Sequence, residues 1–478
     1  MATYTYGDKN GLLEAMRYGN DPDSDPSIDY EYDRLGRLDT KEYDSGHLLS
    51  YSYSGDGQLA RIKESLSGSA NFLYFSLDRL GRLETIRRQN GTATVLHAST
   101  TYNANNQITG QSWKVGRGTD AKTYTESYTY NSADGLLTGV TTATNEVLSL
   151  NRDGLRRLSS ITGGMYTKRY TYRNESETRT TNQLETLSYP DLATPLTYRY
   201  TYNSVGDIST IADPIAGNRE YAYDSQGQML RETINGTAYT YTYDKVGNIL
   251  TANNHSGSHT YVYNHGSWRD QLTKYDGVEI LYDAIGNPTS YYNGRNFTFT
   301  WQNGRELKRA VSDDHTTTYE YDHINGTRLS KTVDDVKYEY YYSGDQLLRM
   351  TIGSGKIVDF FYDQSGQPYA MKYNNKVYYY ILNAQGDVVK LISQTGESYG
   401  IYNYDAWGNL LYVTDNDVMA VNPLRYRGYV YDTETGLYYV SSRYYDPEVG
   451  RFINADAAIG QIGNVQGTNM FAYCLTTQ

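Results

Sequence analysis

An aspartate and an arginine near the C-terminal end of the sequence are the residues whose types could support acid–base chemistry. Asp456 follows Arg451 in the stretch "RFINADAAIG". Two close carboxylates can share a proton and divide the roles of acid and base, and an arginine can polarise a peptide carbonyl. One carboxylate alone cannot do this, so the residues by themselves favour a turn aspartate at Asp456. The nearby "DPEVG", Asp446–Gly450, is interpreted as a plain turn.

Three histidines close together in the sequence raise the question of a metal site. His255, His259 and His265 are spaced so that an extended strand would place all three on one side. The intervening "SGS" and "NHG" are typical of turns, so we interpret them as solvated turn histidines. The sequence contains no HExxH, CxxC, GxSxG or phosphate-binding P-loop motif. We therefore expect no metal, no cofactor and no enzyme that turns over a small molecule.

The composition favours a thin, tyrosine-rich structure over a thick aliphatic core. Of 478 residues 55 are Tyr, against 8 Phe and 4 Trp, and the mean hydropathy is −0.69. A net charge of −12 argues against a nucleic-acid or anionic-membrane partner. The single cysteine, Cys474, excludes an intrachain disulfide. No apolar run reaches the ~18 residues of a membrane span. No signal peptide follows Met1, and the repeats begin at once, so we expect a fragment of a longer protein.

A motif of the form Tyr-x-Tyr-Asp-x-x-Gly recurs about every 20 residues, which indicates a repeat architecture. It stands at Tyr221–Gly227 and again at Tyr241–Gly247. Taking the aspartate or its stand-in as an anchor, we count about eighteen units. The anchors are Asp33, Ser54, Asp78, Asn103, Asn131, Asn151, Arg173, Asn203, Asp224, Asp244, Asn264, Asp283, Gln302, Asp322, Ser343, Asp363, Asn383 and Asp405.

Each unit is predicted to be one β-hairpin. Tyr239, Tyr241 and Tyr243 alternate along the chain, so they share one face of a strand. The residues Asp244–Gly247 fit a three-residue hairpin loop, a type I turn closed by a left-handed glycine. Eighteen hairpins give roughly 36 strands with almost no helix, and so large a sheet must curl. We therefore predict a curved, thin-walled sheet around a space too large for side chains to fill.

The repeats and the C-terminal stretch resemble those of the RHS/YD-repeat proteins, which include polymorphic toxins, toxin-complex subunits and teneurins. The segment "NPLRYRGYVYDTETGLYYVSSRYYDPEVGRFINAD", Asn422–Asp456, is similar to the RHS-associated core signature almost residue for residue. The following "GNVQGTNMFAYCL", Gly463–Leu475, resembles the segment that follows it. The resemblance covers nearly the whole chain.

This resemblance implies an all-β hairpin meander that winds into a spiral, hollow shell, with YD repeats in residues 1–421 and a core segment in residues 422–478. In toxin members the shell encloses a C-terminal toxin, and the core acts as an aspartyl-type autoprotease that frees it. The first aspartate motif of that protease corresponds to Asp456, with Arg451 as its supporting arginine, although Ala457 stands where the family has Pro. The second would follow "FAYCL". We expect that motif and the toxin cargo to be absent from this chain.

The function expected from this resemblance is encapsulation by a secreted or cell-surface bacterial protein. The alternative is an adhesion or glycan-binding scaffold whose tyrosines stack on sugars, although tyrosine ladders that hold the sheet together account for them already. A cell-wall-binding solenoid would carry more Trp, and a β-propeller would repeat about every 40 residues. Unpaired edge strands at the ends of the fragment are expected to promote self-association.

Overall fold

The computed structural model describes residues 2–8, 10–18, 27–66, 69–176, 179–456 and 469–473. These residues form 43 β-strands, one α-helix and two 3-10 turns. The predicted all-β hairpin meander is therefore confirmed. Two compact units, each discontinuous in sequence, divide the chain. Unit 1 comprises Met1–Tyr128, Leu281–Tyr291 and Arg295–Asp359, and unit 2 comprises Thr129–Ile280, Tyr292–Gly294 and Phe360–Gln478. The expected boundary at residues 421/422 stays a prediction.

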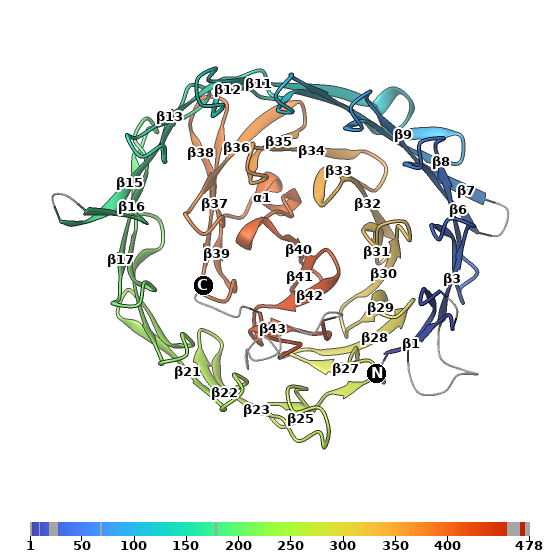
Figure 1. The fold of residues 1–478 in the computed structure, drawn as a ribbon. Coiled ribbons are helices and arrows are strands. Elements are labelled where there is room, and N and C mark those ends of the chain that lie inside the picture. The colour runs from blue at the N-terminus through green and yellow to red at the C-terminus, as the bar shows by residue number, and fades with distance from the viewer. Residues whose placement is uncertain are drawn as a thin grey trace. The chain divides into compact units, whose positions relative to one another are not determined.

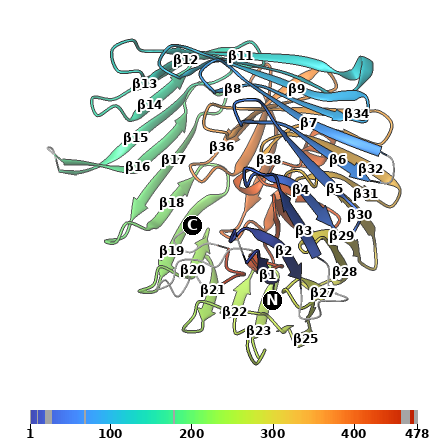
Figure 2. The same ribbon diagram turned by 45° about the vertical axis from the view of Figure 1, so that its right-hand side comes forward.

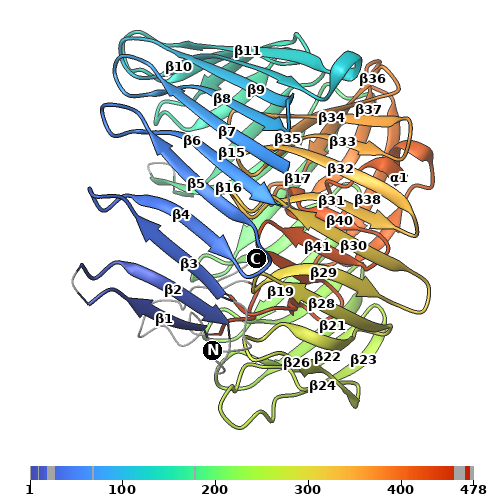
Figure 3. The same ribbon diagram turned by 90° about the vertical axis from the view of Figure 1, so that its right-hand side faces the viewer.

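Within unit 1, successive strands pair antiparallel in the order of the sequence, as Figure 3 shows for β1 to β9. The strands that begin in this unit are β1 (Ala2–Tyr6), β2 (Leu13–Tyr18), β3 (Ser27–Tyr32), β4 (Leu38–Tyr43), β5 (Leu48–Tyr53), β6 (Leu59–Leu66), β7 (Ser69–Leu77), β8 (Leu83–Asn90), β9 (Ala93–Tyr102), β10 (Ile108–Val115), β11 (Lys122–Tyr130), β26 (Leu281–Tyr282), β27 (Pro288–Tyr292), β28 (Asn296–Gln302), β29 (Glu306–Val311), β30 (Thr316–Tyr321), β31 (Arg328–Val333), β32 (Val336–Ser343), β33 (Gln346–Ile352) and β34 (Lys356–Tyr362). The 3-10 turn η1 (Gly118–Asp120) precedes β11.

Unit 2 has the same antiparallel order, which Figure 2 shows for β13 to β18. Its strands are β12 (Leu137–Thr141), β13 (Val147–Arg152), β14 (Leu158–Thr162), β15 (Lys168–Ser176), β16 (Arg179–Tyr189), β17 (Leu196–Tyr202), β18 (Ile208–Asp213), β19 (Gly217–Tyr223), β20 (Met229–Ile234), β21 (Thr237–Tyr243), β22 (Ile249–Asn254), β23 (Gly257–Val262), β24 (Lys274–Tyr275), β25 (Val278–Glu279), β35 (Pro368–Tyr373), β36 (Lys376–Leu382), β37 (Val388–Ser393), β38 (Ser398–Tyr404), β39 (Leu410–Val413), β40 (Val430–Asp432), β41 (Leu437–Val440), β42 (Arg443–Asp446) and β43 (Arg451–Phe452). Helix α1 (Asp417–Val421) and the 3-10 turn η2 (Tyr426–Gly428) lie between β39 and β40. In the described part of the chain, no helix combines the length and apolarity needed to cross a membrane.

The predicted loop chemistry is confirmed at the turn between β21 and β22. Asp244 Oδ1 accepts hydrogen bonds of 2.9 Å from the backbone N–H groups of both Val246 and Asn248. Gly247 has φ +87°, which a residue with a Cβ rarely adopts, and its N–H donates to the Asp244 carbonyl. The register shifts between Thr242 and Tyr243, as a bulge at such a loop requires. The anchor aspartate therefore holds its own turn closed.

In eight of the repeats, the tyrosine before the anchor position links one hairpin to the previous one, which explains why these positions carry Tyr and not Phe. Its hydroxyl donates to a backbone carbonyl on the strand that follows the preceding turn, so a polar group at a half-buried position is satisfied. The donor and acceptor pairs, at 2.7–2.9 Å, are Tyr32 to Leu13, Tyr53 to Leu38, Tyr102 to Leu83, Tyr172 to Leu158, Tyr202 to Leu184, Tyr223 to Ile208, Tyr243 to Met229 and Tyr404 to Val388.

Four of the predicted anchors belong to strands: Gln302 and Ser343 are the last residues of β28 and β32, and the other two lie further inside their strands and are wrong as anchors. Asn151 lies inside β13, opposite Ser160, and the turn is held by Asp153, whose Oδ1 accepts from the N–H groups of Leu155 and Arg157. A constant spacing favoured Asn151, but only a side chain at the strand end can close the loop. Arg173 likewise lies within β15, where its guanidinium donates to the Gln183 side chain.

Tyr241, at the centre of the motif, is a packing residue. It is 4% exposed, and its ring packs edge-on against Trp407 with centroids 5.5 Å apart. Because so little of the Tyr241 ring is exposed, a sugar cannot stack on it. At this position the tyrosine stripe therefore holds the sheet together, as interpreted from the sequence, and does not bind a sugar.

Candidate functional site

The core signature of unit 2 forms a small four-stranded sheet, β40 to β43, coloured red in Figure 1. Its tyrosines anchor it to the last repeat turn. Tyr438 donates to the Gly408 carbonyl at 3.0 Å, and Tyr445 donates to the Trp407 carbonyl at 2.6 Å. Both rings are fully buried. The sheet therefore has a fixed position against the Asp405 hairpin and can hold the residues that follow β43 in place.

Asp456 lies four residues beyond Phe452, the last residue of β43, at a place where residues 469–473 run alongside the chain. Its backbone N–H donates to the Met470 carbonyl at 2.8 Å, and Phe452 makes the equivalent bond to Phe471. The carboxylate forms an ion pair of 3.1 Å with Arg443, whose guanidinium covers the Phe452 ring at 3.5 Å. With 37% of its side chain exposed, Asp456 has water on one side and an arginine on the other. Ala457 lies outside the described residues, as does the segment up to residue 468.

Arg451, the predicted supporting arginine, is held by a different set of partners. Its guanidinium donates to the Tyr263 hydroxyl at 2.6 Å and to the Asp270 carbonyl at 2.5 Å, and it lies 5.0 Å from the Phe471 ring centroid. Burial raises the pKa of Tyr263 to about 12, against the lowering effect of the Arg451 charge. Arg451 thus joins the segment before Asp456 to the loop between β23 and β24. Sequence reasoning missed Arg443, whose only signal is its place in the signature.

The Asp446–Gly450 stretch is a turn, as interpreted, but a buried one. Asp446 Oδ1 accepts from the Glu448 N–H at 2.9 Å, and Oδ2 accepts from Asn293 Nδ2 at 2.7 Å. The Gly450 N–H donates to the Asp446 carbonyl. Asp446 is 0% exposed, so its carboxylate has a structural role in the turn.

The three candidate histidines of unit 2 separate into a pair and a single residue. His255 and His259 both face Glu448, at 3.9 and 3.6 Å. His255 also lies 3.6 Å from Asp405, and His259 lies 2.7 Å from Asp276. The prediction of a solvated turn histidine is wrong for His259. It belongs to strand β23, stacks on Tyr275 and keeps only 12% of its side chain exposed.

His255 gives the stability of unit 2 a pH dependence. The close contact with Asp405 raises the pKa of the His255 imidazole above 6.5 against the effect of burial, and the charge of Glu448 adds to the rise. A raised folded-state pKa contributes stability that is complete below the unfolded value and is lost as the pH rises through the folded value. We expect His255→Gln to lower Tm by about 1–2 °C near pH 5.5 and to have no effect near pH 8.

The measurement is thermal unfolding at a series of pH values, with His265→Gln as the control. His265 accepts a hydrogen bond from the Trp268 N–H, an interaction that needs no charge. A difference between His255→Gln and the parent protein that stays constant with pH would contradict the assignment.

A third group, in unit 1, was not predicted from the sequence. His47, Glu64 and His323 each offer one ligand atom, and these atoms lie within 4.8 Å of one another. Burial and the neighbouring His323 lower the pKa of His47 below 6.5. Burial opposes protonation of His323 too, but its hydrogen bond to Glu306 and the nearby carboxylates raise its pKa. A single sequence carries no signal for this group, because its members are far apart in the chain.

The fold and the packed core signature define a YD-repeat protein. The Teneurin YD-shell family model matches residues 193–473, more than half of the chain, and the chain therefore belongs to this family. It is similar to the tRNA3(Ser)-specific nuclease WapA of Bacillus spizizenii, with 39% identity over 210 residues, which cover 43% of this chain and 9% of the relative. It is also similar to double-stranded DNA deaminase toxin A of Burkholderia cenocepacia, with 24% identity over 57% of this chain and 21% of the relative.

Among solved structures, TcdB2-TccC3 without its hypervariable C-terminal region has the same fold. The match covers 97% of this chain and 27% of that one, with a TM-score of 0.62 at 17% identity. The chain thus spans about a tenth of the length of the nuclease relative and about a quarter of the toxin-complex chain.

Proposed function

We propose that this chain is part of a YD-repeat shell that encloses a C-terminal toxin of a larger, secreted or cell-surface bacterial protein. The observation that carries the proposal is the contrast among its relatives. One is named a tRNA nuclease and another a DNA deaminase, two different chemistries, yet each matches a large part of this chain. The shared region covers only 9% and 21% of those relatives. Sequence that this chain shares with proteins of different activity is expected to serve a step common to them, such as carrying the toxin, and not the catalysis itself.

The hairpins have the properties that a carrier wall needs. In eight repeats, the hydroxyl bond from the motif tyrosine to the preceding hairpin makes the repeat depend on its neighbour, for example from Tyr243 to Met229. A buried ion pair in unit 1, between Arg88 and Asp322, adds a contact between residues distant in sequence. Nearest-neighbour coupling of this kind favours a wall that resists local opening.

The test is protease protection of a cargo in a longer protein that continues past Gln478 along its own gene. We expect a C-terminal epitope tag in that protein to resist a nonspecific protease until the wall is denatured. A second tag placed before Met1 should be removed at once. Digestion of both tags at the same rate would contradict encapsulation.

The alternative, an adhesion or glycan-binding scaffold, requires exposed rings that a sugar can reach. Tyr241 does not meet this requirement, whereas Tyr412 is 53% exposed. A glycan array distinguishes the two functions, because a saturable hit that is lost in Tyr412→Ala, with an unchanged Tm, would favour the scaffold. A carrier gives no such hit.

We further propose that Asp456 belongs to a self-cleaving protease of the longer protein. In support of this, its carboxylate is reachable by water and paired with Arg443, and residues 469–473 run beside it. Arg451 acts as a positioning residue, since its bonds to Tyr263 and Asp270 fix the segment from which Asp456 projects.

A further inference from the structure

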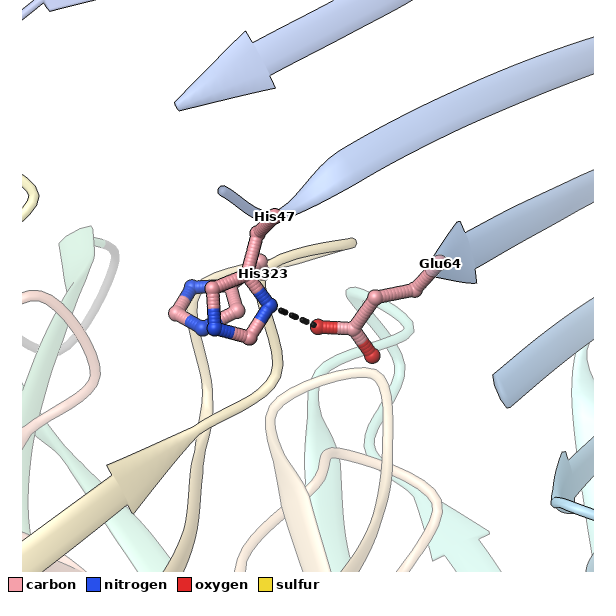
Figure 4. A group of neighbouring side chains, drawn as sticks. All are labelled: His47, Glu64 and His323. Carbon is pink, nitrogen blue, oxygen red and sulfur yellow. Dashed lines mark ion pairs between the residues drawn. The ribbon is translucent and has the colours of Figure 1, made fainter. Parts of the chain in front are cut away.

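The His47, Glu64 and His323 side chains meet at the junction of three separate elements of unit 1. His47 lies in the turn before β5, Glu64 lies on β6, and His323 lies in the turn after β30 (Figure 4). Glu64 is 4% exposed and His323 is 5% exposed, while His47 keeps 18% of its side chain exposed. Two imidazoles and one carboxylate are the ligand types that zinc and related transition-metal ions prefer.

The spacing of the ligand atoms suits a bound cation. Nδ1 of His47 lies 3.3 Å from Oε1 of Glu64. Ligand atoms at about 2.0–2.1 Å from a tetrahedral metal ion are about 3.4 Å apart. This nitrogen is buried and makes no hydrogen bond. It therefore lies close to the Glu64 carboxylate but is not oriented to form a hydrogen bond with it. The His47 and His323 rings are also close, with centroids 3.8 Å apart.

Neighbouring side chains hold two of the three ligands in the orientation that metal binding requires. Nδ1 of His323 lies 3.2 Å from Oε1 of Glu306, so the ring turns its Nε2 toward the group. Oε2 of Glu64 accepts from Asn71 Nδ2 at 3.0 Å, which leaves Oε1 on the side of His47. A carboxylate behind a ligating histidine and a hydrogen bond on a ligating carboxylate are the usual support of protein metal sites.

We propose that His47, Glu64 and His323 form a structural binding site for a divalent transition-metal ion of the zinc class. The ion joins the β4–β5 hairpin and β6 to the turn after β30, elements of unit 1 that are distant in the sequence. Three protein ligands leave one position of a tetrahedral ion for a water molecule or a further donor. The site belongs to unit 1, whereas Asp456 belongs to unit 2, and the site adds a metal requirement to the stability of unit 1.

The first measurement is metal binding by the intact chain after treatment with a chelator. We expect one equivalent of zinc by titration calorimetry, a rise of Tm in excess zinc chloride and no rise in excess magnesium chloride. Cobalt chloride should give the visible absorption bands of a tetrahedral site with nitrogen and oxygen ligands. Absence of a Tm rise with zinc, absence of those bands, or equal binding of magnesium would overturn the proposal.

The second measurement uses variants. His323→Gln and His47→Gln should lose more than about 100-fold in zinc affinity, and Glu306→Gln should lose about 10- to 100-fold because it acts through His323. His315→Gln is the matched control, since His315 forms a more exposed pair with Asp334 in the same unit and should bind zinc as the parent does. Equal affinities in His323→Gln and His315→Gln would place the bound metal elsewhere and overturn the assignment. If a ligand variant does not fold, the cobalt spectrum of the parent protein decides.

Discussion

Replacing Arg349 by Met is expected to lower the free energy of unfolding by about 3–5 kcal/mol. Arg349 is 1% exposed and forms a two-pronged ion pair with Asp359, at 2.5 Å from Nε and 3.0 Å from Nη2. Its Nη1 donates to the Asp120 carbonyl at 2.7 Å. Tyr124 completes the group by donating to Asp359 Oδ2 at 2.6 Å. The arginine therefore connects the β33–β34 hairpin with the turn before β11 inside unit 1.

The expected loss of stability is large because the substitution leaves the buried Asp359 carboxylate in place. Without Arg349, the buried Asp359 carboxylate keeps only part of its hydrogen bonds and has no opposite charge, a state that costs far more than the loss of an exposed pair. The double variant Arg349→Met, Asp359→Leu removes both charges and should recover most of the stability. Arg349→Lys keeps a charge but cannot form two parallel bonds, so it should fall between the parent and Arg349→Met.

Denaturant unfolding followed by tyrosine fluorescence measures these differences. The control is Arg117→Met, because Arg117 lies 4.0 Å from Glu339 with 51% of its side chain exposed and should contribute less than about 1 kcal/mol. Equal midpoints for Arg349→Met and Arg117→Met, or a double variant less stable than the single one, would contradict the argument.

Local chemistry explains why the hairpins could be predicted from the sequence. At Asp244 and Gly247, every bond that closes the turn is made within five consecutive residues, so the motif itself specifies the structure. The choice between Asn151 and Asp153 failed because spacing was used in place of that chemistry. Asp153 carries the complete pattern, with Arg157 bonded to its carboxylate.

Contacts between distant segments could not be predicted in this way. Asp322 occupies the same motif position as Asp244, yet it is 0% exposed and pairs with Arg88. The repeat specifies a turn at both places, and only the packing of unit 1 decides which turn becomes buried and needs a counter-charge. The same holds for the His47 group, whose members come from a turn, a strand and another turn. A periodic sequence determines its own hairpins, while the partners across the fold depend on tertiary structure.

Asp456→Asn is expected to abolish self-cleavage in a protein that continues past Gln478 along its own gene. Hydrolysis of a peptide bond by carboxylates needs one group to activate water and another to donate a proton, and an amide can do neither. The family resemblance identifies Asp456 as the first of the two aspartates and places the second one downstream. The parent protein should therefore give two bands on a denaturing gel, and the Asp456→Asn protein should give one.

Variants of the two arginines test whether Asp456 belongs to a protease or has only a structural role in this segment. Arg443 contacts the Asp456 carboxylate, so Arg443→Gln should slow cleavage and change its pH profile with little change in Tm. Arg451 holds the backbone through Tyr263 and Asp270, so Arg451→Gln should slow cleavage and lower Tm together. Asp415→Asn, at an exposed position before α1, is the control and should cleave as the parent does. If the longer parent chain stays intact, or if Asp456→Asn cleaves at the parent's rate, Asp456 is a turn residue whose pair with Arg443 serves only to hold the segment after β43 against β42.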